Sequence, residues 1–70
     1  MNELYFKRKE VHKWFDSLWR NHKERDKYYR ELAKLMNISY EECHFSLMNE
    51  EQLDRALAII KQLWWEKFDK

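Results

Sequence analysis

Residues 49–68, NEEQLDRALAIIKQLWWEKF, decide the fold of this chain. Apolar side chains recur along this stretch every three or four residues, which is the spacing of one face of an α-helix. Asn49 and Gln52 are three residues apart and can form a capping box, so we expect a helix from Glu50 to about Phe68. Its broad apolar face is expected to comprise Leu53, Ala56, Leu57, Ile60, Leu63, Trp64 and Phe68.

Helical segments are also expected upstream of this stretch. Asn21 with Glu24, and Ser39 with Glu42, have the spacing of capping pairs that mark helix starts. The predicted segments are Glu3–Arg20, His22–Met36 and a short helix from Tyr40 to about Phe45. The sequence therefore predicts an all-α fold, a small orthogonal or antiparallel bundle of three main helices and one short helix, forming a single domain over residues 1–70.

The composition limits which functions the chain can perform. It contains neither glycine nor proline, although average usage of about 7% and 5% predicts several of each. Glycine supplies positive φ angles and allows a backbone to approach a ligand closely. Without it the chain has little means of building a phosphate-cradling loop or an oxyanion hole. We therefore expect no enzyme activity and no catalytic residues.

Cys43 and His44 come closest to a metal or nucleophile motif. Structural zinc sites usually take paired Cys or His ligands about two to four residues apart, and this sequence has one cysteine. Adjacent side chains on a helix diverge by about 100°, which places a Cys–His pair poorly for proton transfer. We predict no metal and no cofactor, and we expect Cys43 to act as a small buried hydrophobic residue.

Aromatic side chains are too numerous for a core of this size. Four Trp, four Tyr and four Phe occur in 70 residues, and each can bury about 150–250 Å². Some rings should lie at the surface, where clustered aromatics mark contact sites. The alternative is that Tyr and Trp sit half-buried at the rim of the core. The candidate protein contacts are Trp65, Trp19, Tyr5 and Phe6.

Positive charge is concentrated in the first half of the chain. Residues 1–36 hold ten Lys or Arg against six Asp or Glu, and residues 37–70 hold four against seven, so +4 and −3 give the net charge of +1. Candidate contacts for nucleic acid on the second predicted helix are Lys23, Lys27, Arg30 and Lys34. The alternative is a solvated face on which acids such as Asp26 pair with these cations.

A set of polar residues accompanies a family resemblance. HKWFDSLW at residues 12–19, Arg25 with Tyr29, and the Cys-His pair at 43–44 together resemble the helical tail of small zinc-finger-containing proteins of phages and plasmids. The similarity covers about residues 12–60, and the paired cysteines of the zinc ribbon are missing from this sequence. It implies a compact helical module of bacterial mobile-element origin. The polar cluster that it implies comprises His12, Asp16, Arg25, Tyr29 and His44.

Neither an export signal nor an apolar run near 18 residues is apparent, so we expect a cytoplasmic protein without a membrane partner. The function predicted first is that of a small non-catalytic binding module. Its exposed aromatic side chains would contact a protein partner or a second copy of the chain. An adaptor, an inhibitor and a homo-oligomer all fit this prediction. The alternative is a nucleic-acid-binding accessory protein that uses the basic face of the second helix.

Overall fold

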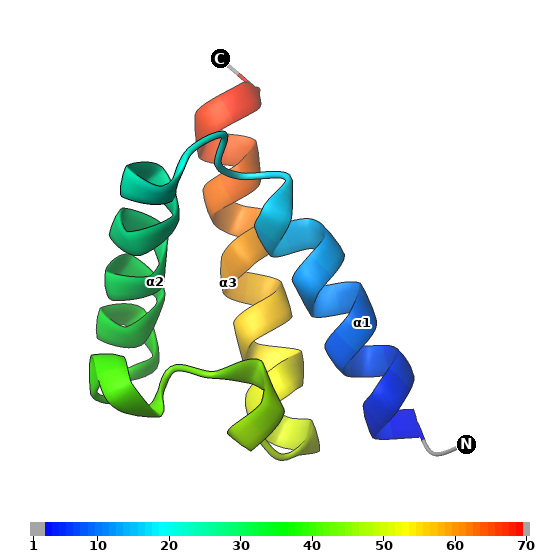
Figure 1. Ribbon diagram of the computed structural model, residues 1–70. Helices are drawn as coiled ribbons and strands as arrows, with labels where there is room; N and C mark the ends of the chain where they lie inside the picture. The colour runs from blue at the N-terminus through cyan, green and yellow to red at the C-terminus, as the bar shows by residue number, and fades with distance from the viewer. Residues whose placement is uncertain (1–2, 70) are drawn as a thin grey trace.

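Three α-helices form most of residues 3–69, the part of the chain that the computed structural model describes. α1 and α3 run in the same direction, α2 runs antiparallel to them, and α3 packs against both (Figure 1). Residues 3–69 contain no strand. The all-α prediction is confirmed, as are the bounds of the second and last predicted helices. The three helices are α1 Glu3–Asp16, α2 His22–Met36 and α3 Glu50–Phe68.

α1 ends at Asp16, earlier than the predicted Arg20. The amides of Ser17 and Leu18 donate to carbonyl oxygens three residues back, at 3.2 and 3.0 Å, and the Ser17 hydroxyl donates to the Trp14 carbonyl at 2.6 Å. This tighter turn stops the α-helix. It also places Leu18 in the core, where its side chain is fully buried. The prediction was wrong here because burial of Leu18 outweighs continuation of the helix.

The predicted short helix is replaced by two 3₁₀ turns, η1 Tyr40–Glu42 and η2 Phe45–Leu47. The Ser39 capping box is present, so the predicted start is confirmed. The chain is extended at His44, and the flanking residues Cys43 and Phe45 are both buried. Residues two apart point to one side of an extended segment but to nearly opposite sides of a helix. Burial of both side chains therefore favours the extended backbone.

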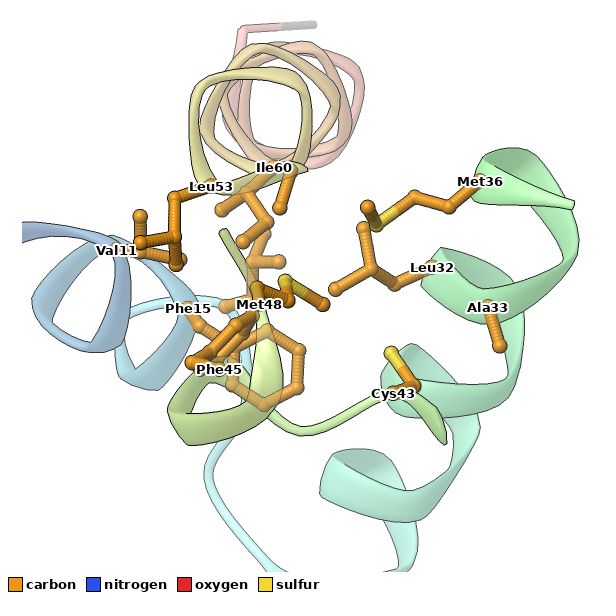
Figure 2. Packing of buried hydrophobic residues seen from close by; sticks show 12 residues of the cluster. Val11, Phe15, Leu32, Ala33, Met36, Cys43, Phe45, Met48, Leu53 and Ile60 are labelled. Carbon is orange, nitrogen blue, oxygen red and sulfur yellow. The ribbon is translucent and has the colours of Figure 1, made fainter. Parts of the chain in front are cut away.

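The core is one cluster of twelve buried apolar residues drawn from all three helices and from both segments that connect them (Figure 2). Cys43 belongs to it, as predicted. Among the twelve aromatic rings only Phe15 and Phe45 are buried, because the helices fill most of the interior with aliphatic side chains. Five rings are exposed, including Phe68, which was predicted to lie on the apolar face of the last helix. The exposed rings are Tyr5, Phe6, Tyr40, Trp65 and Phe68.

Phe45 connects α1, α2 and the segment between α2 and α3. Its ring lies 5.5 Å from that of Phe15 and 6.0 Å from that of Tyr29, measured between ring centroids. Its backbone carbonyl accepts a hydrogen bond from Arg8 Nε at 3.1 Å, and Arg8 Nη2 donates to the Met48 carbonyl, also at 3.1 Å. Arg8 thus links α1 to both ends of η2 through hydrogen bonds.

Phe45→Ala should destabilise the fold strongly, because it removes a buried ring that three segments share. We expect the free energy of unfolding in urea to fall by about 3–5 kcal/mol. Phe6→Ala is the matched control: its ring is 55% exposed, so a loss below about 1 kcal/mol is expected. If Phe45→Ala does not fold, Phe45→Leu supplies the measurement. Equal losses for the variants at positions 45 and 6 would contradict the central role of Phe45.

Asn37 ends α2 in the left-handed conformation, with φ 59° and ψ 43°. Its amide donates to the Lys34 carbonyl at 3.1 Å, which closes the last turn of the helix. Asparagine tolerates this conformation better than other residues that carry a Cβ atom, although glycine tolerates it best. The structure therefore uses Asn37 at the position where a helix end most often has glycine.

Substitutions at Asn37 should separate backbone strain from side-chain contacts. Asn37→Ala is expected to lower the free energy of unfolding by about 1 kcal/mol, because alanine adopts positive φ at a cost. Asn37→Gly should leave stability equal or raise it. Thermal unfolding of the two variants beside the wild type provides the measurement. A glycine variant less stable than the alanine variant would contradict this explanation.

Candidate functional site

A groove of about 820 Å³ runs along α1 beside Trp64 of α3. The α1 residues that line it repeat at helical spacing and form a second stripe next to the buried one. Phe6, Trp14 and Trp64 are the aromatic residues among those that line it. We call this surface the aromatic groove, and its lining residues are Phe6, Lys9, Glu10, Lys13, Trp14, Ser17 and Trp64.

Aromatic contacts extend from this groove along the C-terminal half of α3. The Trp64 ring packs edge-on against that of Trp14, with centroids 5.9 Å apart, and against that of Trp65 at 5.5 Å. Phe68 lies 5.0 Å from Trp64 on the next turn. The exposed Trp65 and Phe68 are thus continuous with half-buried rings. A partner that covers the groove can therefore contact Trp65 and Phe68 as well.

Three of the four predicted protein contacts lie at or near this surface. Phe6 lines the groove, Tyr5 packs edge-on against Phe6 with ring centroids 5.5 Å apart, and Trp65 is 54% exposed beside Trp64. Trp19 does not line the groove: it is half-buried, with its centroid 6.5 Å from that of Phe15. Sequence reasoning assigned Trp14 and Trp64 to the core alone. The spacing of Phe6, Trp14 and Ser17 was the available signal for a second stripe.

The predicted polar cluster is divided in the structure. Arg25, Tyr29 and His44 line one pocket between α2 and the segment that follows it. His12 packs against Phe45 instead, with ring centroids 4.8 Å apart. Asp16 lies close enough to raise the pKa of Tyr29, although burial is the larger cause of that increase. Within residues 3–69 no hydrogen bond joins His12 to Asp16, although their spacing permits one.

The four cations predicted to contact nucleic acid share one exposed face of α2. They line a shallow hollow of about 530 Å³ together with two acids. Lys27 also stands 5.8 Å from the ring of Tyr28. None of these six side chains forms an ion pair within residues 3–69, so the face keeps its excess of positive charge. The lining residues are Lys23, Asp26, Lys27, Arg30, Glu31 and Lys34.

The thiol of Cys43 is 1% exposed, and burial raises its pKa from 9.0 to about 11. A neutral, enclosed thiol is a poor nucleophile, because the thiolate is the reactive form. Within residues 3–69 no three His, Cys, Asp or Glu side chains are arranged to hold a metal ion. The same residues include no helix both long and apolar enough to span a bilayer.

Comparison with models of protein families identifies a match for this chain. The model of a family described as a zinc-finger-containing domain matches residues 1–63. No curated protein and no solved structure matches the chain.

The residues of this chain do not fit a structural zinc site. Such sites require about four ligands, usually cysteine or histidine, and the sequence offers Cys43 as its one cysteine. Its thiol faces the apolar core and stays protonated, whereas zinc binds the thiolate. His12 is engaged with the Phe45 ring and is not grouped with other ligands. The zinc finger in the description of the family therefore finds no counterpart among the described residues.

The raised pKa of Cys43 predicts a loss of stability in mild alkali. Between pH 9 and 11 the thiol ionises in the unfolded chain but stays protonated in the fold, so the unfolded state gains stability as pH rises. We expect the free energy of unfolding to fall by about 1 kcal/mol between pH 8 and 10. Urea unfolding at these pH values provides the measurement. In Cys43→Ala this fall should disappear; an identical pH dependence in that variant would contradict the assignment.

Proposed function

The chain belongs to the family of the zinc-finger-containing domain, and from this premise we propose that it is a small non-catalytic binding module that contacts another protein through the aromatic groove. The observation that carries the proposal is that Phe6, Trp14 and Trp64 line one groove and that the Trp64 ring contacts those of Trp14 and Trp65. Trp65 and Phe6 are each more than half exposed. Tryptophan is enriched among residues that dominate binding energy, and contiguous exposed apolar surface marks interaction sites.

The charges around the groove favour a partner with acidic residues beside its apolar anchors. Lys9 and Lys13 line the groove, and Lys61 stands 5.2 Å from the Trp14 ring. Glu10 is the one carboxylate among the lining residues. Opposite charge at the rim guides docking and fixes its register. We propose an amphipathic segment of acidic character as the occupant.

A second copy of this chain fits the groove less well. The acidic first turn of α3 is the obvious surface to face the lysines of the groove. However, Lys7 already binds Glu50 at 3.0 Å and Asp54 at 2.8 Å. Using these carboxylates between copies would require breaking that network. The proposal therefore names a different protein, with self-association as an outcome that the test distinguishes.

We also propose that the protein is cytoplasmic and that its gene comes from a phage or a plasmid. The origin rests on the resemblance carried by the residue 12–19 stretch and the Cys43–His44 pair. Finding neighbouring genes that encode phage or conjugation proteins would support this origin. Finding the gene always among chromosomal housekeeping genes would contradict it.

Nucleic-acid binding is a second candidate function, favoured by the cations gathered on α2. Lys23, Lys27, Arg30 and Lys34 lie on one face at helical spacing and outnumber the two acids there. Phosphate contacts of this kind weaken steeply as salt concentration rises. Aromatic contacts at the groove tolerate salt, because apolar burial is not screened. Salt dependence therefore separates the two functions.

Photo-crosslinking tests the groove directly. A benzophenone amino acid at position 6 should capture a protein in lysate of the source organism, and capture should persist at high salt. Trp65→Ala should weaken this capture by about thirtyfold, as expected for a residue that supplies about 2 kcal/mol of binding energy. The captured protein is then identified and its affinity measured with wild type and variant.

Leu47 provides the matched control, because it is 69% exposed and lies outside the groove. The crosslinker at position 47 should not capture the same protein, and Leu47→Ala should leave capture from position 6 unchanged. Light scattering that shows a dimer dissociated by Trp65→Ala would replace the partner with a second copy. Capture of nucleic acid that Lys27→Ala abolishes, with no effect of Trp65→Ala, would favour the second candidate.

A further inference from the structure

A second hollow lies between α2 and the segment that follows it, separate from the aromatic groove. Its volume is about 250 Å³, and it shares no lining residue with the groove. Arg25, Tyr29 and His44 bring hydrogen-bond donors to its wall, and none of its lining residues is a carboxylate. We call it the donor pocket, and it is lined by Arg25, Tyr29, Tyr40, Cys43 and His44.

The guanidinium of Arg25 has no counter-charge. Its Nε atom is buried and has no hydrogen-bond acceptor. Within residues 3–69 no carboxylate lies within ion-pair distance of Arg25, and its guanidinium stands 5.9 Å from the Trp19 ring. A half-buried charge without an acceptor is unfavourable. An anion in the pocket would supply the counter-charge that the described residues do not give Arg25.

The neighbouring groups suit the same ligand. Burial raises the pKa of Tyr29, so the phenol keeps its proton and stays a donor. No acid lines the pocket, although Asp16 lies close enough to contribute to the raised pKa of Tyr29. Asp26 accepts a hydrogen bond from the Tyr40 hydroxyl at 3.5 Å, and Glu42 is held by Ser39 Oγ at 2.9 Å.

We propose that the donor pocket binds a phosphate-sized oxyanion, with the Arg25 guanidinium as its counter-charge and Tyr29 as a further donor. The volume suits one such group with a small attached moiety, since pockets for larger organic ligands are about 300–1,000 Å³. The ligand is either free orthophosphate or the phosphate of a monoester. Arginine recognises such oxyanions through paired, charge-assisted hydrogen bonds.

Titration of the ¹⁵N-labelled protein with sodium phosphate tests this site. The ionic strength is held at about 0.15 M with chloride, so that screening stays constant. The Arg25 Nε–H signal and the amides of Cys43 and His44 should shift and saturate. Arg25→Gln should weaken binding by about tenfold or more, because it removes a charge-assisted contact. Arg20→Gln, an exposed arginine outside the pocket, is the matched control and should bind as the wild type does.

Tyr29→Phe keeps the ring and removes one donor, and it should weaken binding by about threefold to tenfold. If Arg25→Gln does not fold, Tyr29→Phe is the variant that tests the pocket. Shifts that rise linearly without saturation, or equal affinity for wild type and Arg25→Gln, overturn the proposal. Parallel titrations with phenyl phosphate and adenosine 5′-monophosphate identify the source of the anion. Saturable binding tighter than that of orthophosphate supports a monoester, and equal or weaker binding supports the free anion.

Discussion

Burial of Phe45 is the constraint on which the rest of this small structure depends. The residue lies in a segment without α-helix, yet its side chain is 2% exposed and its ring packs beside Phe15 and Tyr29. Holding Phe45 there requires the extended backbone at His44, which also buries Cys43. The same path brings Tyr40 and His44 against α2, where they form one wall of the donor pocket. One buried ring thus fixes both the core and the course of the chain around it.

The chain has more aromatic bulk than its core accepts, and this excess shapes its surface. Aliphatic side chains from α2 and α3, such as Leu32 and Ile60, fill the space between the helices, and only two of the twelve rings enter it. The other rings are displaced outward, but those on α1 and α3 remain in contact with one another. Trp14 and Trp64 are half-buried because the two helices cross there, and Trp65 extends the aromatic surface beyond the crossing. The aromatic groove follows from where the helices cross.

Local signals predicted α2 and α3 completely, because each helix has a capping residue and an uninterrupted apolar period. The end of α1 and the segment after α2 could not be predicted in this way. There, Leu18 and Phe45 are placed by packing against helices distant in sequence, and tertiary burial overrides the local periodicity. Candidate contacts such as Phe6 and Trp65 were accessible to sequence reasoning because they depart from the apolar stripe. The role of Tyr40 in the donor pocket was not, because its position depends on a backbone path that has no period.

Two half-buried arginines differ in whether the fold supplies their hydrogen-bond acceptors. Arg8 donates through Nε to the Phe45 carbonyl and through Nη2 to the Met48 carbonyl, so it serves the structure. Arg25 stands on the other side of the same ring cluster and finds no acceptor. If Arg25 were only structural, a glutamine or methionine would pack against Trp19 without the cost of desolvating a charge. A guanidinium that lines a pocket beside two phenols, with no carboxylate among the lining residues, is reasonable where the acceptor is supplied from outside the chain.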